Sequence, residues 1–291
     1  LRLPRRLTSP HTPVSVPHAS THPVALTIAG SDSGGGAGLQ ADLKAMHAHG
    51  AFGMSVVTAI TAQNSQAVTA ALDLPADLVQ AQIDAVAGDF QVHAVKTGML
   101  SSRVLIDAVA DGIERHGLGP VVVDPVMISK SGFALLKPDA VEAVKARMLP
   151  LARLATPNVH DAEALTGQTI RSLDEAQAAA AAIHAMGARS VLVKGGHRDG
   201  EADAVDVLYD GTTLAFLRSP RIDTPNTHGT GCTYASAIAA GLARGFELAT
   251  AVGRAKAYLT EAIRQALPLG HGHGPVHHFW HLDPERAIQA A

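Results

Sequence analysis

A glycine turn that leads directly into a helix is the stretch of this sequence best suited to bind an anion. Gly229–Cys232 reads Gly-Thr-Gly-Cys and precedes an unbroken run of small and apolar residues, Tyr234 to Leu242, which is typical of a buried helix. A helix N-terminus leaves backbone N–H groups unpaired and carries a partial positive charge. Glycine lets an anion approach that backbone closely. The junction is therefore either an anion cradle or only the cap of a core helix, and the rest of the chain must decide.

The single cysteine of the chain, Cys232, lies in this junction. A lone cysteine usually behaves as a small buried apolar residue. At a helix N-terminus the pKa of a thiol is lowered, so a thiolate at Cys232 is a chemically reasonable base for a substrate hydroxyl. Two roles stay open: the base, or packing against substrate while charge neutralisation does most of the work. One cysteine allows no intramolecular disulfide, which fits a reducing cytoplasm.

Polar and glycine-rich segments also follow most of the expected strands. In a mostly parallel sheet, ligands bind at the carboxyl ends of the strands, so we expect these segments on one rim. Each one alone also fits a capped turn, a helix cap or a solvent-facing side chain. The segments are Gly30–Gly38 with Asp32, Gln63-Asn64, Gly98-Met99, Asp124–Met127, Asn158 with Asp161 and Glu163, and Lys194–His197.

The side chains of this rim suit phosphate chemistry. Phosphoryl transfer needs positioning and charge neutralisation more than covalent chemistry. Lys194 is placed to reach phosphate oxygens, and Asp124, Asp161 and Glu163 are candidates to hold Mg²⁺, directly or through water. Neither glycine loop has the Walker A spacing, and Gly30–Gly38 does not fit the G-x-G-x-x-G dinucleotide pattern.

A regular alternation of strand and helix patterns must position these residues. The alternation predicts an α/β fold with a mostly parallel sheet covered on both faces. Asp210-Gly211 predicts a hairpin between two later strands. The expected strands are Val24–Ala29, Met54–Ala62, Val92–Thr97, Pro120–Asp124, Ser190–Lys194, Val205–Tyr209 and Thr213–Leu217. The expected helices include Ala76–Gly88, Arg103–His116, Pro138–Leu149, Leu173–Met186, Thr230–Arg244 and Leu248–Ala266.

Composition limits the possible partners and the number of domains. The 291 residues are 47% apolar and 17% charged, and the formal net charge of −3 gives no reason to expect nucleic acid or an anionic membrane as a partner. No window approaches the roughly 20 apolar residues that span a bilayer. Residues 24–291 are expected to form a single domain. Residues 1–23 carry five prolines, three arginines and no acid; they are predicted to be disordered or peripheral, either as a ragged N-terminus or as a transit peptide.

Taken together, the motifs from Val24 to His281 resemble the hydroxymethylpyrimidine/phosphomethylpyrimidine kinases of thiamin biosynthesis, within the ribokinase-like superfamily. The resemblance covers nearly everything except the N-terminal tail. The matching segments are Ala29–Lys44, Thr61–Asn64, Lys96–Leu100, Val123–Met127, Thr156–Asn158, Val193–His197, Asn226–Thr233 and Gly272–Phe279.

The resemblance implies a ribokinase-like three-layer α/β/α fold and an ATP-dependent, Mg²⁺-requiring kinase. Its substrates would be 4-amino-5-hydroxymethyl-2-methylpyrimidine and then the monophosphate, in a cytoplasmic homodimer. By this likeness the aminopyrimidine edge would bind Gln63, the ring would lie against the Ala37 backbone, Met99 and Val126, and the hydroxymethyl group would lie near Asp42. The implied phosphate and ATP contacts are Lys194, Asn158, Thr224, Gly229, Thr230 and Gly231, with Cys232 among the catalytic group.

Two departures from the family pattern concern the ATP end of the site. The superfamily's Asn-x-x-Glu magnesium motif is Asn158-Val-His-Asp161 here, with Glu163 two residues later, and aspartate is the shorter side chain. Pro225 stands where many relatives place lysine. Either change is expected to alter nucleotide affinity.

Alternative functions and a histidine cluster complete the expectations. A pyridoxal kinase is the nearest alternative enzyme, since pyridoxal is a hydroxymethyl-bearing ring of similar shape. A silent ligand-binding relative is the alternative from another class, and the retained Lys194, Asp124 and Gly229–Cys232 argue against it. The C-terminal histidines are expected to be structural rather than metal ligands; they are His271, His273, His277, His278 and His281.

Overall fold

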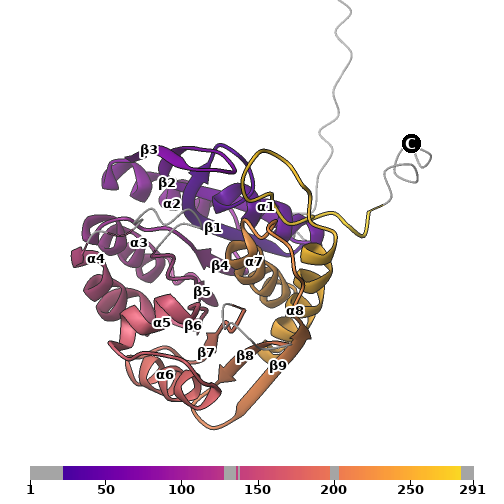
Figure 1. Ribbon diagram of the computed structural model, residues 1–291. Coiled ribbons are helices and arrows are strands. Elements are labelled where there is room, and N and C mark those ends of the chain that lie inside the picture. The colour runs from indigo at the N-terminus through magenta and orange to yellow at the C-terminus, as the bar shows by residue number, and fades with distance from the viewer. Residues whose placement is uncertain (1–21, 128–135, 137, 197–202, 283–291) are drawn as a thin grey trace, which may run out of the picture.

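One nine-stranded sheet runs through the computed structural model, which describes residues 22–127, 136, 138–196 and 203–282 (Figure 1). The strand order is β3-β2-β1-β4-β5-β6-β7-β8-β9. The six strands from β2 to β7 in this order are parallel. The edge strand β3 pairs antiparallel with β2, and β8 pairs antiparallel with both β7 and the other edge strand, β9. Their bounds are β1 Val24–Asp32, β2 Phe52–Gln63, β3 Val68–Asp73, β4 Ala94–Thr97, β5 Val121–Val123, β6 Ala152–Ala155, β7 Val191–Val193, β8 Asp203–Tyr209 and β9 Leu214–Pro220.

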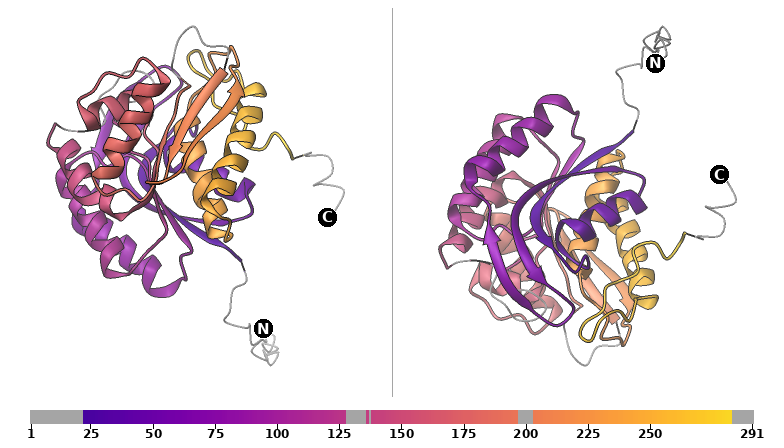
Figure 2. Two further views of the ribbon diagram at one scale, coloured as in Figure 1. Left: turned by 90° about the horizontal axis from the view of Figure 1, so that it is seen from below. Right: turned by 90° about the horizontal axis from the view of Figure 1, so that it is seen from above.

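Helices cover both faces of this sheet, so the fold has three layers (Figure 2). On one face lie α1 (Gly38–Ala48), α7 (Thr230–Ala243) and α8 (Leu248–Arg264). The other face carries α2 (Ala76–Asp89), α3 (Arg103–Arg115), α4 (Pro138–Ala143), α5 (Val159–Thr166) and α6 (Leu173–Ala185). The predicted three-layer α/β/α fold with a mostly parallel sheet is confirmed.

Successive side chains of each central strand pack alternately into the two hydrophobic cores on either side of the sheet. In β5, Val121 and Val123 pack into the core beneath α2–α6, while Val122 packs into the core beneath α7 and α8. Successive side chains of a strand point to opposite faces, so a strand covered on both sides must be apolar throughout. The short apolar runs of the sequence are therefore the buried central strands.

Most predicted elements are present, whereas the strands β3 and β6 and the helix α5 are present without having been predicted. The segment β3 was not predicted; it is an edge strand whose side chains are all at least partly exposed, so it lacks the apolar pattern of the other strands. The predicted helix 138–149 is instead α4 followed by a π-helical turn at Val144–Met148 and a short 3₁₀ turn at Leu149–Leu151.

Some expectations fall outside the described residues. The segment 1–23 lies there apart from His22 and Pro23, and so does His197. Within the described residues, no helix combines the length and the apolar character needed to cross a membrane.

Candidate active site

The N-terminus of α7 meets the glycine loop that follows β1. Gly229 is the N-cap of α7 and has a φ of 80°, in the left-handed region that favours glycine. A methyl group at Gly229 would overlap the Gly36 carbonyl oxygen. The two glycine segments singled out in the sequence are therefore packed against each other, and residue 229 has to be glycine for two independent reasons.

The same helix end faces a lysine and a carboxylate from the neighbouring strands. A methyl group at Gly231 would lie 3.3 Å from Lys194 Nζ and 3.8 Å from Asp124 Oδ2. Lys194 Nζ in turn lies 2.8 Å from Asp124 Oδ1. Lys194 directly follows β7 and Asp124 directly follows β5, so the carboxyl ends of the strands bring these groups to α7. The result is an anion-binding helix end with a cation beside it.

Asp124 keeps one carboxylate oxygen without a partner. Its Oδ1 accepts from Lys194 and from the Thr156 hydroxyl at 3.1 Å, but the buried Oδ2 has no hydrogen-bond partner among the residues that the structure describes. A buried unpaired carboxylate oxygen is costly, and it suits a hard divalent cation. Asp124 is thus the carboxylate of the site best placed to bind a metal ion.

The other two predicted carboxylates are used differently. Asp161 and Asn158 form the capping box of α5, and Asp161 also accepts from the Met127 amide at 3.3 Å. Burial, with Asp124 nearby and despite Lys194, raises the pKa of Asp161 to about 7. The Glu163 side chain turns to the far end of α5, where Oε1 accepts from the Ile170 amide at 2.8 Å.

Of the three carboxylates predicted to hold Mg²⁺, Asp124 and Asp161 therefore lie near each other, whereas Glu163 is turned away. Among the described residues, no group of three or more histidine, cysteine or acidic side chains is arranged to hold a metal ion.

Cys232 differs from the expected low-pKa thiol. Burial raises the pKa of Cys232 to about 11; Asp42 and Asp124 raise it further, while Lys96 and the Gly38 amide lower it. The expectation of a thiolate is contradicted for the ligand-free protein, because desolvation and two carboxylates outweigh the helix end. Cys232 is a neutral thiol here.

Asp42 lies in a buried ionic cluster beneath the helix end. Its carboxylate accepts two bonds from Lys96 Nζ, at 2.9 and 2.8 Å, one from Thr27 at 2.6 Å and one from Ser236 at 2.7 Å. The side chains of Asp42 and Lys96 have no exposed surface. Burial opposes the charge on Lys96, but Asp42, with Cys232 and Asp124, raises its pKa. Asp42 was expected near the substrate; its contacts here are those of a residue that anchors α7 to the sheet.

Gln63 lies beside a histidine–aspartate pair that the sequence did not single out. His228 Nε2 is 2.9 Å from Asp32 Oδ2 and 3.4 Å from Gln63 Nε2. Asp32 also accepts from the backbone amides of Gly34, Gly36 and Ala37. Burial works against the charge of Asp32, but His228 and these amides lower its pKa overall. His228 directly precedes Gly229, and its place in the matching segment Asn226–Thr233 was the signal for it in the sequence.

The remaining predicted residues lie around the same rim. The Ala37 amide is held by Asp32, and Val126 lines a narrow cleft with Gly98 and Asp124. Met99 is partly exposed beside Gly30. Thr224 accepts from the Asn226 amide at 3.2 Å, in the segment that leads to α7.

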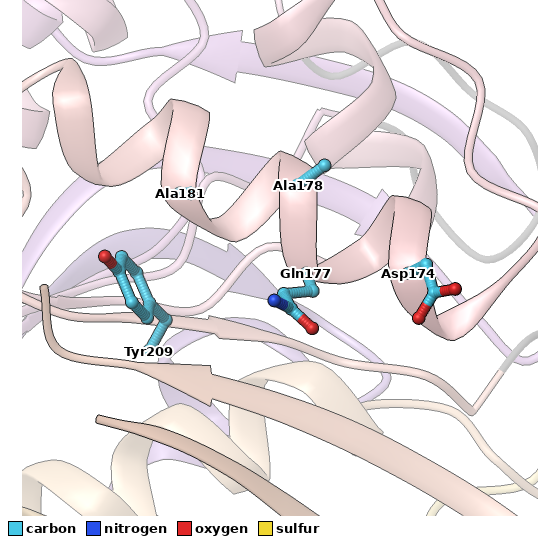
Figure 3. A pocket seen from close by; sticks show the side chains of 5 residues that line it. All are labelled: Asp174, Gln177, Ala178, Ala181 and Tyr209. Carbon is cyan, nitrogen blue, oxygen red and sulfur yellow. The ribbon is translucent and has the colours of Figure 1, made fainter. Parts of the chain in front are cut away.

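A larger hollow lies elsewhere, between α6 and β8 (Figure 3). Its volume is about 270 Å³, and Tyr209 faces α6 across it, with Asp174 and Gln177 on the helix side. Tyr209 pairs with Val191 at the start of β7. The hollow therefore lies at the amino ends of the parallel strands, whereas the α7 N-terminus lies at their carboxyl ends. None of the predicted site residues lines it.

A C-terminal segment, residues 267–278, here called the strap, forms hydrogen bonds with His228, with the loop after β2 and with α7. The His228 amide donates to the Gly274 carbonyl, and the His273 amide donates to Ser65 in the loop after β2. His278 is buried and its Nε2 is 2.9 Å from the Thr233 hydroxyl in α7. His273 and His278 are thus hydrogen-bonded to other parts of the fold.

Comparisons with known proteins give a consistent result. Residues 32–277 match the family described as phosphomethylpyrimidine kinase. A hydroxymethylpyrimidine/phosphomethylpyrimidine kinase of Rhizobium meliloti is 56% identical over 88% of this chain and 97% of its own length. An ADP complex of Bacillus subtilis pyridoxal kinase has a TM-score of 0.83 at 40% identity, covering 89% and 98% of the two chains. Staphylococcus aureus pyridoxal kinase with AMP-PCP and pyridoxal has a TM-score of 0.81 at 35% identity, covering 87% and 92%.

Proposed function

Because the chain belongs to the phosphomethylpyrimidine kinase family, we propose that it phosphorylates 4-amino-5-hydroxymethyl-2-methylpyrimidine with ATP and then phosphorylates the monophosphate. By its membership it is a phosphotransferase of thiamin biosynthesis. The observation that carries the proposal is the meeting of the α7 N-terminus with Lys194 and Asp124. Backbone donors, a cation and a carboxylate in one place suit charge neutralisation during phosphoryl transfer.

The proposed roles follow from these positions. The amides of Thr230 and Gly231 would hold the transferring phosphoryl group, and Lys194 would contact phosphate oxygens. ATP would extend towards Asn158 and Thr224, as the family resemblance implies. The pyrimidine would lie between the loop after β1 and Gln63, whose amide offers one donor and one acceptor to the aminopyrimidine edge.

Cys232 keeps two candidate roles. As a general base it would have to lose its own proton first, so the base role requires its pKa to fall from about 11 when substrates bind. Binding of a cationic group or removal of competing carboxylate charge would act in that direction. The packing role requires no such change.

The residues of the site fit Mg²⁺ at Asp124, whose buried Oδ2 is unpartnered. We propose that Asp124 holds the ion directly or through water, with Asp161 contributing through water. When bound, the ion would supply charge neutralisation to the phosphates. A homodimer and a cytoplasmic location are proposed on the family resemblance.

A pyridoxal kinase is the second candidate, because two solved pyridoxal kinases share this fold at 40% and 35% identity. Pyridoxal carries a hydroxymethyl group on a ring of similar size, but it lacks the aminopyrimidine edge that Gln63 would recognise.

One assay distinguishes the candidates. The enzyme is incubated with ATP and Mg²⁺ and with hydroxymethylpyrimidine, its monophosphate or pyridoxal, and mass spectrometry counts the phosphates added. We expect one and then two phosphates on the pyrimidine. Preference for pyridoxal by more than about tenfold in kcat/KM, or roughly 1.4 kcal/mol, would contradict the proposal. Tight pyrimidine binding without ADP release would instead indicate a silent relative.

A further inference from the structure

The contacts of the Gln63 amide contain a conflict that fixes its orientation. Gln63 Nε2 lies 3.4 Å from His228 Nε2, and Gln63 Oε1 lies 3.1 Å from Thr61 Oγ1. His228 Nε2 also lies 2.9 Å from Asp32 Oδ2, and Thr61 Oγ1 lies 2.9 Å from the Ser31 carbonyl oxygen. His228 thus lies closer to the Asp32 carboxylate than to Gln63, and Thr61 lies closer to the Ser31 carbonyl than to Gln63.

Counting protons settles which end of the amide faces which neighbour. His228 Nε2 must carry a proton, because it faces the ionised Asp32 carboxylate, so it repels the N–H groups of Gln63 Nε2. The single hydroxyl proton of Thr61 goes to the Ser31 carbonyl, which can only accept, so it is not available to Gln63 Oε1. Exchanging the amide oxygen and nitrogen resolves both conflicts, since amide ends are assigned by their hydrogen-bond partners.

In the resolved network, Gln63 Oε1 faces the His228 Nε2–H group, which it shares with the closer Asp32 Oδ2, and Gln63 Nε2 donates to Thr61. One lone pair and one N–H remain for a ligand. The acceptor then lies on the side of His228 and Gly229, and the donor lies on the side of Thr61 in β2. The neighbours of Gln63, and not Gln63 itself, determine which side of its amide offers the acceptor and which offers the donor.

We propose that His228, held by Asp32, and Thr61 are positioning residues that lock the Gln63 amide and so select both the base edge and the orientation of the ring. This inference rests on the proposed aminopyrimidine substrate. The 4-amino group would bind the acceptor on the His228 side, and the adjacent ring nitrogen would bind the donor on the Thr61 side. The 5-hydroxymethyl group is next to the 4-amino group, so this orientation directs it towards Gly229 and the α7 N-terminus.

Removing the His228 donor should allow the amide to reverse. In a His228→Leu variant, the N–H group that faces the Gln63 oxygen is lost, so the reversed amide is no longer disfavoured on that side. The reversed amide matches the 4-oxo analogue of the substrate, in which a carbonyl replaces the amino group and the ring nitrogen carries hydrogen. The lock thus predicts a change of specificity and not only a loss of activity.

The experiment compares the amino substrate with its 4-oxo analogue. Two ratios are measured for each enzyme: the ratio of kcat/KM values and the ratio of dissociation constants by calorimetry without ATP. For His228→Leu we expect the preference for the amino compound to fall by about tenfold or more in both ratios. His228→Gln, whose side-chain amide restores an N–H near the position of Nε2, is expected to keep the wild-type preference within about threefold.

A second pair of variants makes the test independent of residue 228. Thr61→Val removes the acceptor that holds Gln63 Nε2 and is expected to lower the amino preference as well. Thr58→Val is the matched control on the same strand, because the Thr58 hydroxyl bonds the Met99 carbonyl and makes no contact with Gln63. It is expected to leave the preference unchanged.

The outcomes separate this inference from the proposed function. Equal losses on both compounds in His228→Leu and Thr61→Val, with the preference intact, would overturn the lock. A His228→Gln variant that loses the wild-type preference for the amino compound would also overturn the lock. A wild-type enzyme that binds the amino compound selectively but transfers no phosphate would contradict the proposed function, while the ratios of dissociation constants would still decide the lock.

Discussion

Replacing Lys96 with methionine should cost more stability than any change to an exposed lysine of this chain, because it strands a charge in the core. Asp42 accepts two bonds from Lys96 Nζ and one each from Thr27 and Ser236, and neither charged side chain has exposed surface. Without Lys96 the carboxylate keeps only two hydroxyl donors, and water cannot reach it. Removing one partner of a buried pair typically costs about 3–5 kcal/mol, and we expect a loss in that range.

The measurement is the free energy of unfolding from denaturant titration at pH 7. Lys145→Met is the matched control, because the Lys145–Glu142 pair is similarly short, at 2.7 Å, but Glu142 is 72% exposed. We expect that control to change the free energy by no more than about 1 kcal/mol. The double variant Lys96→Met with Asp42→Leu removes both charges and should recover at least about 2 kcal/mol relative to the single variant.

The reasoning would be refuted if Lys96→Met cost less than about 1 kcal/mol, or if the double variant were less stable than Lys96→Met. Either result would mean that the Asp42 carboxylate finds another partner or becomes hydrated. In that case the cluster could not be what fixes α7 against the sheet.

Three further predictions concern other parts of the site. Cys232→Ala should lower kcat by about 100-fold if the thiol is the base, whereas near-normal kcat in a pre-steady-state assay would leave only the packing role. Gly229→Ala should abolish most activity, because its methyl group meets the facing loop; Gly245→Ala shares the φ of 80° but has open space, and should cost only about 1–2 kcal/mol of stability with activity retained. Burial, with Lys44 and His277, lowers the pKa of His278 from 6.5 to about 4, so its contribution is complete above pH 6.5 and is lost as the pH falls towards 4. His278→Gln should therefore reduce the loss of unfolding free energy between pH 7 and pH 5 by about 2 kcal/mol, and an unchanged loss would contradict this assignment.

The order of strands and helices along the chain could be predicted from the sequence, because the patterns that identify each element are local. Apolar runs such as Val121–Val123 identify buried strands, and Asp210-Gly211 identifies the hairpin of β8 and β9, where Gly211 has a φ of 94°. The strand β3 was missed because an edge strand exposed on its surface carries no such pattern.

The meeting of the rim residues could also be predicted, since parallel strands place their carboxyl ends together. The hydrogen-bond partners of each side chain at this rim could not be predicted. Asp42 is 54 residues from Lys96 and 194 from Ser236, and no local pattern connects them. The pKa of Cys232 was predicted from its helix end alone, but the tertiary surroundings, with burial first, determine it. Glu163 was placed in the metal set by its spacing, whereas the Ile170 amide draws it away.

The strap of residues 267–278 has a consequence for the order in which the protein matures. His228 and the loop at Ser65 are held by Gly272, His273 and Gly274, which follow every strand and helix of the described residues. A chain emerges from the ribosome N-terminus first, and its sheet can begin to form during synthesis. The contacts of the strap with His228 and Ser65 can therefore form only after residues 272–274 are released. The nascent protein should acquire its sheet before it acquires the contacts around Gln63 on which its proposed substrate selectivity depends.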